Sequence, residues 1–518
     1  MHSPAGRCAA AILALAGVLV PAAAEGPDGD RVFFAHQTAM VEAPVVLVVF
    51  DELPLATLLG RDGRIDARLF PGFAELQRRS TWYRNTTASE TFTKEARPAL
   101  LTGTYPIRDL GRSFKYPKSL FSLLGATHEV RAADIPPNVC PPSLCDEPIG
   151  APPVQRFHAF GRGDKGALFL SFLGDLAPPD RPRLHLLHLV FPHGPWRYLP
   201  DGRRYLEVDP MPGEVNERGR GTSWRRDGWL VTQGYQRHVL QTQLADKLVS
   251  ALLVKLKRTK LFDDALLVVT ADHGIGWEPG APKRLPNKRT AGTLGWVPLF
   301  VKAPGQRDPY VSDAPAQTVD VLPTIAGHLD AATWPGVDGI PLATEHPLRR
   351  RRLVVDVRVP RGLRLLRRAV EEKHELLGGP DGKIDPWRVA PGAAESLVGL
   401  QVGEMTVGGP GAATFRSAAL EALVASGPRE GTFPAFFEGT IDGVTGDRRP
   451  LVAIAVNGKI AGVTRSYRSY GLLWFGALLR PGAFTEGDDE VELFLVEDVR
   501  GRSVVPLPRA GAEPATRW

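Results

Sequence analysis

The stretch VVLVVFDE at residues 45–52 decides how this sequence is interpreted, together with its counterpart ALLVVTADHG at residues 265–274. Each is an uninterrupted run of mostly β-branched residues that leads into acidic residues. Such a run is typical of a parallel strand with both faces buried. Because ligand sites in parallel sheets gather beyond the carboxyl ends of the strands, the two polar ends are expected to meet at one edge of the sheet.

The polar residues at these strand ends form a candidate metal site. Asp51 and Glu52 follow the first run, and Asp272 and His273 follow the second. An oxygen-rich site with one imidazole accepts Mn²⁺, Zn²⁺, Ca²⁺ or Mg²⁺. We therefore predict one divalent metal ion held by Asp51, Asp272 and His273, and we leave open whether Glu52 is a further ligand.

The first two thirds of the chain alternate between two patterns. Between residue 45 and about residue 342, apolar runs of strand length alternate with longer amphipathic segments, which predicts a doubly wound, mostly parallel α/β sheet. Further strands are expected at 184–191 and 297–302. Apolar residues at helical spacing predict helices at 73–79 and 235–256.

The last third has a different texture. From about residue 397, short strand-like segments follow one another, with one helical stretch at 417–425. Asn457-Gly458 lies between two apolar runs, which is a strong hairpin signal. Residues 490–496 alternate acidic and apolar side chains, as in a half-buried edge strand. We predict a signal peptide at 1–24, an α/β catalytic domain at 25–348, a linker at 349–396 and a β-sandwich-like domain at 397–518.

Composition bounds the partners of the protein. The 518 residues are 43% hydrophobic and 23% charged, and 63 Lys and Arg against 57 Asp and Glu give a formal net charge of +6. This mild excess favours anionic substrates or a membrane surface without selecting either, and it does not indicate nucleic acid. Oligomeric state is not readable from the sequence.

The N-terminus has the pattern of a signal peptide. Arg7 precedes an apolar stretch at 8–20 and the small residues PAAAE at 21–25, so cleavage is expected after Ala24. The alternative is an uncleaved anchor. Export to the periplasm or medium leaves Cys140 and Cys145, and a close pair in a Pro-rich loop of an exported protein predicts a disulfide.

A series of short motifs resembles those of a known family. Residues 91–106 read TFTKEARPALLTGTYP, which resembles the nucleophile segment of the sulfatase-like branch of the alkaline phosphatase superfamily. Counting back from LLTG at residues 100–103 places Thr93 on the nucleophile and Arg97 on the motif arginine. Residues 70–86, 191–195 and 319–325 resemble further family motifs in the same order. The resemblance implies an alkaline phosphatase/sulfatase-like fold over about 300 residues and leaves the last third outside it.

The residues themselves agree with that chemistry. A threonine hydroxyl is a weak nucleophile unless a metal ion or a base activates it, and the predicted metal site could also bind Thr93. If Thr93 begins a helix, Arg97 four residues later lies on the same face. The helix N-terminus would add donors for an anionic group.

Other candidates come from the family pattern. His193, in a Pro-His-Gly-Pro loop, resembles the histidine that contacts the substrate or its leaving group. Lys288, or its neighbour Arg289, lies near the position of the family's active-site lysine. We interpret the remaining candidates, His185, His188 and His238, as structural residues.

One departure from the pattern directs the functional hypothesis. Formylglycine sulfatases need Cys or Ser where this chain has Thr93, and Pro where it has Glu95. Threonine resembles instead the nucleophile of lipoteichoic-acid synthases and phosphoethanolamine transferases. We therefore predict a metal-dependent hydrolase or phosphotransferase that acts on phosphoesters through a covalent intermediate on threonine. Its substrate is expected to be anionic and either lipid-linked or part of an envelope polymer. The alternatives are a sulfuric ester hydrolase without formylglycine and a glycan-binding or envelope-binding protein with an inactive hydrolase domain.

Overall fold

A computed structural model describes residues 41–510, except 107–115, 134–138, 141–143, 145–164, 179, 206–211, 218–220, 343–352, 355–356, 359, 361, 380, 418–434 and 486–488. The predicted signal peptide, Cys145 and the helix expected at 417–425 fall wholly or mostly outside the described residues, so these remain predictions. Across the described part of the chain, no helix is both long and apolar enough to span a bilayer.

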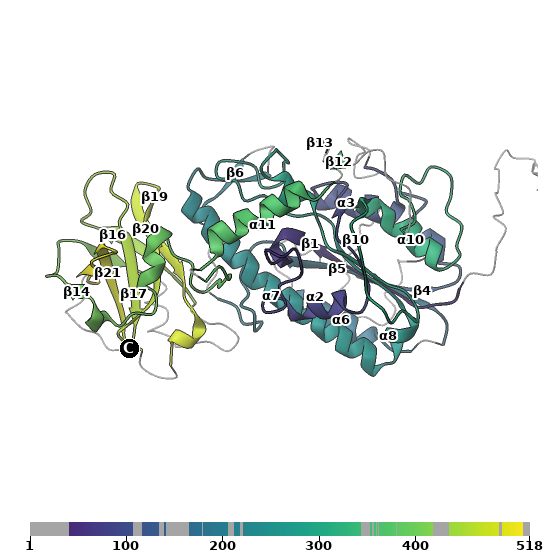
Figure 1. The fold of residues 1–518 in the computed structure, drawn as a ribbon, viewed down its shortest axis with the longest axis horizontal. Coiled ribbons are helices and arrows are strands. Elements are labelled where there is room, and N and C mark those ends of the chain that lie inside the picture. The colour runs from purple at the N-terminus through teal and green to yellow at the C-terminus, as the bar shows by residue number, and fades with distance from the viewer. Residues whose placement is uncertain are drawn as a thin grey trace, which may run out of the picture.

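The larger part of the molecule is a three-layer α/β body around a seven-stranded sheet (Figure 1). The strand order is β10-β2-β9-β8-β1-β5-β4, and only β9 runs antiparallel to its neighbours. The sheet is therefore mostly parallel, as predicted. Its strands are β1 (Val45–Asp51), β2 (Thr81–Tyr83), β4 (Glu129–Ala133), β5 (Arg183–Pro192), β8 (Leu266–Ala271), β9 (Leu299–Lys302) and β10 (Tyr310–Ser312).

The central strand β1 shows why the sequence folds this way. All seven of its residues are buried, and it lies between β5 and β8. Val46, Val48 and Phe50 pack into the core on one face, whereas Val45, Leu47 and Val49 pack on the other. A strand flanked and covered on all sides needs the continuous apolar run that the sequence supplies.

Helices cover both faces of the sheet (Figure 1). One face carries α3 (Thr93–Thr102), α4 (Leu120–Leu124) and α10 (Val321–His328). The other carries α2 (Pro71–Gln77), α6 (Lys165–Asp175), α7 (Gly228–Arg258), α8 (Leu261–Asp264) and α11 (Arg364–Leu377), with the short α1 (Leu55–Leu58) and α9 (Ala291–Gly295) against α11. Helix α11 comes from the stretch predicted as a linker, yet its apolar residues join the core of the body.

The C-terminal region consists of two antiparallel-rich sheets, in agreement with the predicted β-sandwich-like domain. One sheet is ordered β14-β22-β21-β17-β18 and the other β15-β16-β20-β19, and side chains from both fill one core. The bounds are β14 (Thr406–Val407), β15 (Thr414–Arg416), β16 (Phe436–Asp442), β17 (Leu451–Val456), β18 (Lys459–Arg465), β19 (Tyr467–Ser469), β20 (Leu472–Leu478), β21 (Val491–Asp498) and β22 (Ser503–Pro506).

Two local predictions in this region have different outcomes. Asn457 and Gly458, with φ of 51° and 72°, form the turn between β17 and β18, which confirms the hairpin. The predicted edge strand is wrong in position, because β21 lies between β22 and β17. Residues on both faces of β21 pack into hydrophobic cores, so the alternation of acidic and apolar residues does not distinguish this interior strand from an edge strand.

Helix α7, 31 residues long, connects the two regions. Near its start, the Gln233 side chain donates to Gly476 O at 2.8 Å and to Thr464 Oγ1 at 3.0 Å. The buried Arg237 guanidinium lies 4.2 Å from the ring centroid of Phe436. Farther along, Asp246 accepts from the backbone nitrogens of Gly72 and Phe73 and so caps the first turn of α2.

The remaining elements are short. They are β3 (Thr86–Thr87), β6 (Glu214–Glu217), β7 (Gly221–Trp224), β11 (Ala316–Gln317), β12 (Leu353–Val354) and β13 (Val357–Arg358). The β6–β7 hairpin continues by backbone hydrogen bonds onto residues 281–283, which lead into the functional site.

Candidate metal centre and active site

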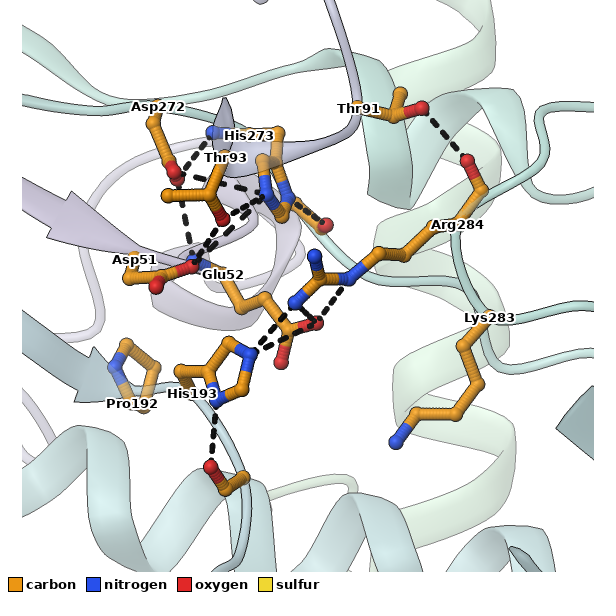
Figure 2. Close-up of polar contacts among 12 residues, drawn as sticks. Asp51, Glu52, Thr91, Thr93, Pro192, His193, Asp272, His273, Lys283 and Arg284 are labelled. Carbon is orange, nitrogen blue, oxygen red and sulfur yellow. Dashed lines mark hydrogen bonds and ion pairs between the residues drawn. The ribbon is translucent and has the colours of Figure 1, made fainter. Parts of the chain in front are cut away.

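The acidic half of the site is the group Asp51, Asp272, His273 and Thr93 (Figure 2). Asp51 ends β1, and Asp272 and His273 directly follow β8, the neighbouring strand. One ligand atom from each of Asp51, Asp272 and His273 can be chosen so that all three lie within 4.8 Å of one another. All three side chains are at most 1% exposed, so the sequence-predicted trio comes together in a buried position.

The donor atoms of this trio fit a cation. Asp272 Oδ1 accepts from the backbone nitrogen of His273 at 2.6 Å, but Asp272 Oδ2 and Asp51 Oδ2 are buried with no hydrogen-bond partner among the residues that the structure describes. Unpaired carboxylate oxygens are costly inside a protein unless a positive group meets them. Two carboxylates and an imidazole also form a donor set that divalent metals accept.

The backbone after the metal-site histidine fixes the orientation of its ring. His273 Nδ1 lies 2.8 Å from Gly274 O, so Nδ1 carries the hydrogen and Nε2 presents its lone pair to the cluster. A side chain on Gly274 would place its Cβ 1.9 Å from Thr293 O, so only glycine fits there. Burial raises the pKa of Asp272, but the neighbouring His273 and His188 outweigh it and hold that pKa at about 2. The carboxylate is therefore ionised.

Thr93 is the first residue of α3, which is the condition under which Arg97 lies on the same face of the helix, and Phe92 precedes it in extended conformation. Its Oγ1 lies 3.0 Å from His273 Nε2 and 3.3 Å from Asp51 Oδ1. The hydroxyl thus points into the carboxylate cluster. Pro98 is accommodated inside α3, and Gly103 with φ of 67° ends the helix.

The ion-paired half of the site consists of Glu52, Arg284 and His193. Glu52 has φ of 58°, which turns its side chain away from the direction taken by Asp51 (Figure 2). Arg284 Nη2 lies 2.8 Å from Glu52 Oε1 and 2.6 Å from His193 Nε2. Because a guanidinium only donates, His193 Nε2 is the acceptor in this arrangement.

These contacts determine the charge of the ion-paired half. Burial raises the pKa of Glu52, but His193 and Arg284 outweigh it and hold the pKa well below its usual value. Burial lowers the pKa of Arg284, but Glu52 and Asp51 leave it above its usual value. Glu52 is therefore a carboxylate neutralised by a guanidinium, and it lies outside the metal-ligand trio.

The remaining predicted residues have mixed placements. Arg97 lies on the same side of α3 as Thr93, and its Nη1 is 3.4 Å from His188 Nδ1. Lys288 is exposed, and Arg289 pairs with Glu278 at 2.8 Å. The basic residue that contacts Glu52 and His193 is instead Arg284. Several cations occur between residues 283 and 289, and the sequence offered no signal to choose among them.

A cluster of aromatic rings lies beside the ion-paired half of the site. Trp196, Trp224, Trp277 and Tyr235 pack against one another, with neighbouring ring centroids 4.4 to 6.1 Å apart. His238 of α7 lies beside them, and its Nε2 is 3.0 Å from Glu52 O. The prediction that His238 is structural agrees with this position.

Comparisons with known proteins show what part of this site is similar to. Residues 144–331 match the family model described as Sulfatase. The matched segment contains Asp272, His273, His193 and Arg284, but it begins after Asp51 and Thr93. A comparison with curated proteins found no match.

Solved structures with related folds include sulfatases and a phosphonate ester hydrolase. A 2-O GAG sulfatase is 18% identical, with 58% of this chain and 73% of that chain covered and a TM-score of 0.43. The phosphonate monoester hydrolase of Agrobacterium radiobacter is 16% identical, with 58% and 76% covered and a TM-score of 0.44. A putative sulfatase from Bacteroides thetaiotaomicron is 17% identical, with 58% and 74% covered and a TM-score of 0.41. The similarity to the Sulfatase model covers residues 144–331, which form part of the α/β body.

Proposed function

We propose that the protein is a metal-dependent hydrolase or phosphotransferase that acts on phosphoesters through a covalent intermediate on Thr93. The observation that carries this proposal is the position of Thr93 Oγ1, 3.0 Å from His273 Nε2 and 3.3 Å from Asp51 Oδ1. A buried hydroxyl that faces the metal-ligand atoms is suited to be a nucleophile. A threonine that only began a helix would not need to have its hydroxyl directed at an imidazole and a carboxylate.

Asp51, Asp272 and His273 would hold one divalent cation, with Thr93 beside it. When bound, the cation lowers the pKa of a hydroxyl and offsets negative charge on an ester oxygen. Thr93 Oγ loses its proton to solvent and forms the new bond to phosphorus, while the ester oxygen departs with the electron pair of the broken P–O bond and takes up a proton from solvent. Water or an alcohol then loses a proton to solvent and bonds to phosphorus, while Thr93 Oγ departs with the electron pair of its own P–O bond and is reprotonated.

Arg284 and His193 stand where an anionic ester can be bound. Arg284 keeps part of its side chain accessible at 22% exposure, and its contacts with Glu52 and His193 use only some of the five N–H donors of the guanidinium. Guanidinium groups bind phosphate oxygens in a bidentate manner. We propose that both residues contact the anionic group or the leaving oxygen, and that Arg97 adds positive charge from α3.

The substrate class in this proposal is an anionic ester, either lipid-linked or part of an envelope polymer. The net charge of +6 supports an anionic partner. Export rests on the N-terminal sequence alone. A purified chain whose N-terminus begins after Ala24 would support export, whereas one that retains residue 1 would contradict cleavage.

Intact-mass spectrometry tests the nucleophile. The enzyme with Mn²⁺ is exposed briefly to an aryl phosphodiester and then fragmented to locate any adduct. We expect a phosphoryl-type adduct on Thr93, loss of the adduct and of turnover in Thr93→Ala, and an unchanged adduct in Thr102→Val at the other end of α3. Full turnover by Thr93→Ala would contradict the assignment.

Sulfate-ester hydrolysis by the unmodified threonine is the second candidate, because residues 144–331 match the Sulfatase model. Parallel assays with an aryl phosphodiester and an aryl sulfate separate the two reactions. Turnover of the sulfate ester alone would replace the phosphoester proposal. Absence of both activities in a protein that binds no metal would favour the envelope-binding alternative.

A further inference from the structure

His188 has a position that its sequence context did not indicate. It lies within β5, surrounded in sequence by apolar residues, and its side chain is only 2% exposed. Its Nε2 lies 4.0 Å from Asp51 Oδ2 and 3.8 Å from Asp272 Oδ2. These are the two carboxylate oxygens that have no hydrogen-bond partner among the described residues.

The other ring nitrogen of His188 faces a cation. Arg97 Nη1 lies 3.4 Å from His188 Nδ1, and a guanidinium can only donate. Nδ1 therefore presents its lone pair to Arg97. In the neutral imidazole the hydrogen is then on Nε2, directed to the side where the carboxylates lie.

Asp51 divides its two oxygens between different neighbours. Oδ1 lies near Thr93 Oγ1 at 3.3 Å and His273 Nε2 at 3.9 Å, on the side of the proposed metal ion. Oδ2 lies on the side of His188. At 4.0 Å, His188 Nε2 is near Asp51 Oδ2 without a hydrogen bond between them. A polar group beside a metal-binding carboxylate orients the carboxylate and tunes its affinity for the metal.

We infer that His188 is a positioning residue for the metal centre, held by Arg97 through Nδ1 and directing its Nε2–H toward the Oδ2 atoms of Asp51 and Asp272, and that it is not itself a metal ligand. The inference rests on the metal site of the proposed function. It assigns to Arg97 a contact that connects α3 with β5 and the carboxylates, in addition to any contact with substrate.

The same strand supplies a matched control. His185 is three residues away on β5, is fully buried, and faces the opposite side of the sheet, where it packs edge-on against Phe172 at 6.4 Å. Replacing either histidine by leucine removes one buried imidazole from the same strand. Only one of the two replacements removes a contact with the carboxylate cluster.

The test is the affinity for Mn²⁺ of the whole protein without substrate, measured by the electron paramagnetic resonance signal of free Mn²⁺. We expect His188→Leu to bind Mn²⁺ about 10- to 100-fold more weakly than wild type, the range seen when such outer contacts are removed. His188→Gln should recover most of the affinity, because an amide can accept from Arg97 and donate to a carboxylate. His185→Leu should bind as wild type does.

The outcomes separate this inference from the proposed function. Unchanged affinity in His188→Leu, with tight binding by wild type, overturns the role of His188 and leaves the metal site in place. Failure of wild type to bind Mn²⁺ overturns the metal site itself. Where His188→Leu does not fold, spin-echo modulation of Mn²⁺ in wild type decides: one coordinated imidazole supports a positioning role, and two show that His188 is a ligand.

Discussion

Asp51 and Glu52 are adjacent in sequence, yet their carboxylates have different neighbours in the two halves of the site. Asp51 lies in the acidic half, and its buried Oδ2 has no hydrogen-bond partner in the described part of the chain, whereas Glu52 in the ion-paired half is neutralised by Arg284 at 2.8 Å. The positive φ of Glu52 separates their directions. The comparison shows that the number of acidic residues at a strand end does not give the number of metal ligands, because a nearby guanidinium can form an ion pair with one of these acids.

The largest expected effect lies in the acidic half. Asp272→Asn keeps the shape of the side chain but removes a buried negative charge, so Mn²⁺ affinity should fall by roughly 100-fold or more, beyond what outer contacts contribute. Metal content and Mn²⁺ titration of both proteins measure this. Equal metal content in wild type and Asp272→Asn would contradict the assignment of the acidic half as the metal site.

Arg284 should give the next largest effect. Arg284→Met removes charge-assisted hydrogen bonds of about 1.5 to 3 kcal/mol, which predicts a KM increase of roughly 10- to 100-fold for an anionic ester. Arg284→Lys keeps the positive charge but lacks the planar guanidinium, so its KM should lie between the KM values of wild type and Arg284→Met. Steady-state kinetics with Mn²⁺ titration as a control check this, because metal affinity should not follow the change in KM.

Glu52→Gln is the sharpest test of the comparison. Because Glu52 pairs with Arg284 and lies outside the metal-ligand trio, Mn²⁺ affinity should stay within about threefold of wild type, while KM rises by about tenfold as Arg284 loses its charged partner. A loss of metal as large as in Asp272→Asn would make Glu52 a ligand and erase the contrast between the halves.

The last expected effect concerns stability instead of binding, at a buried cation for which the described residues provide no carboxylate contact like that of Arg284. Lys373 of α11 is 1% exposed, and its Nζ donates to the carbonyl oxygens of Thr57, at 3.2 Å, and Leu59. Burial lowers the pKa of Lys373 to about 7, whereas carboxylates raise that of Arg284.

Because the folded-state pKa of Lys373 is lowered, the unfolded chain binds more protons between pH 7 and about 10. The free energy of unfolding should then rise with pH in this window, by about 1.4 kcal/mol per pH unit at most, and not below it. Urea unfolding of wild type and Lys373→Met at pH 7 and 9 measures the difference. Parallel pH profiles of the two proteins would contradict the prediction.

Much of the fold and half of the site follow from the sequence. Continuous apolar runs identify central strands, and the residues at their ends meet because neighbouring parallel strands finish at one edge, which is why Asp51, Asp272 and His273 were predictable. Arg284 was not, because a loop carries no periodicity that selects one cation among several. His188 was not, because a polar residue within a buried strand is indistinguishable in sequence from a structural histidine such as His185.

Helix α7 has a consequence for how the architecture can change in evolution. Its first turns provide Gln233 and Arg237 to the C-terminal sheets, and its middle holds Glu52 through His238. A descendant that lost or exchanged the C-terminal sandwich would expose the buried guanidinium of Arg237, which lies on the same helix that supports the site. Exchange of the C-terminal region would therefore require compensating substitutions at the residues of α7 that contact it.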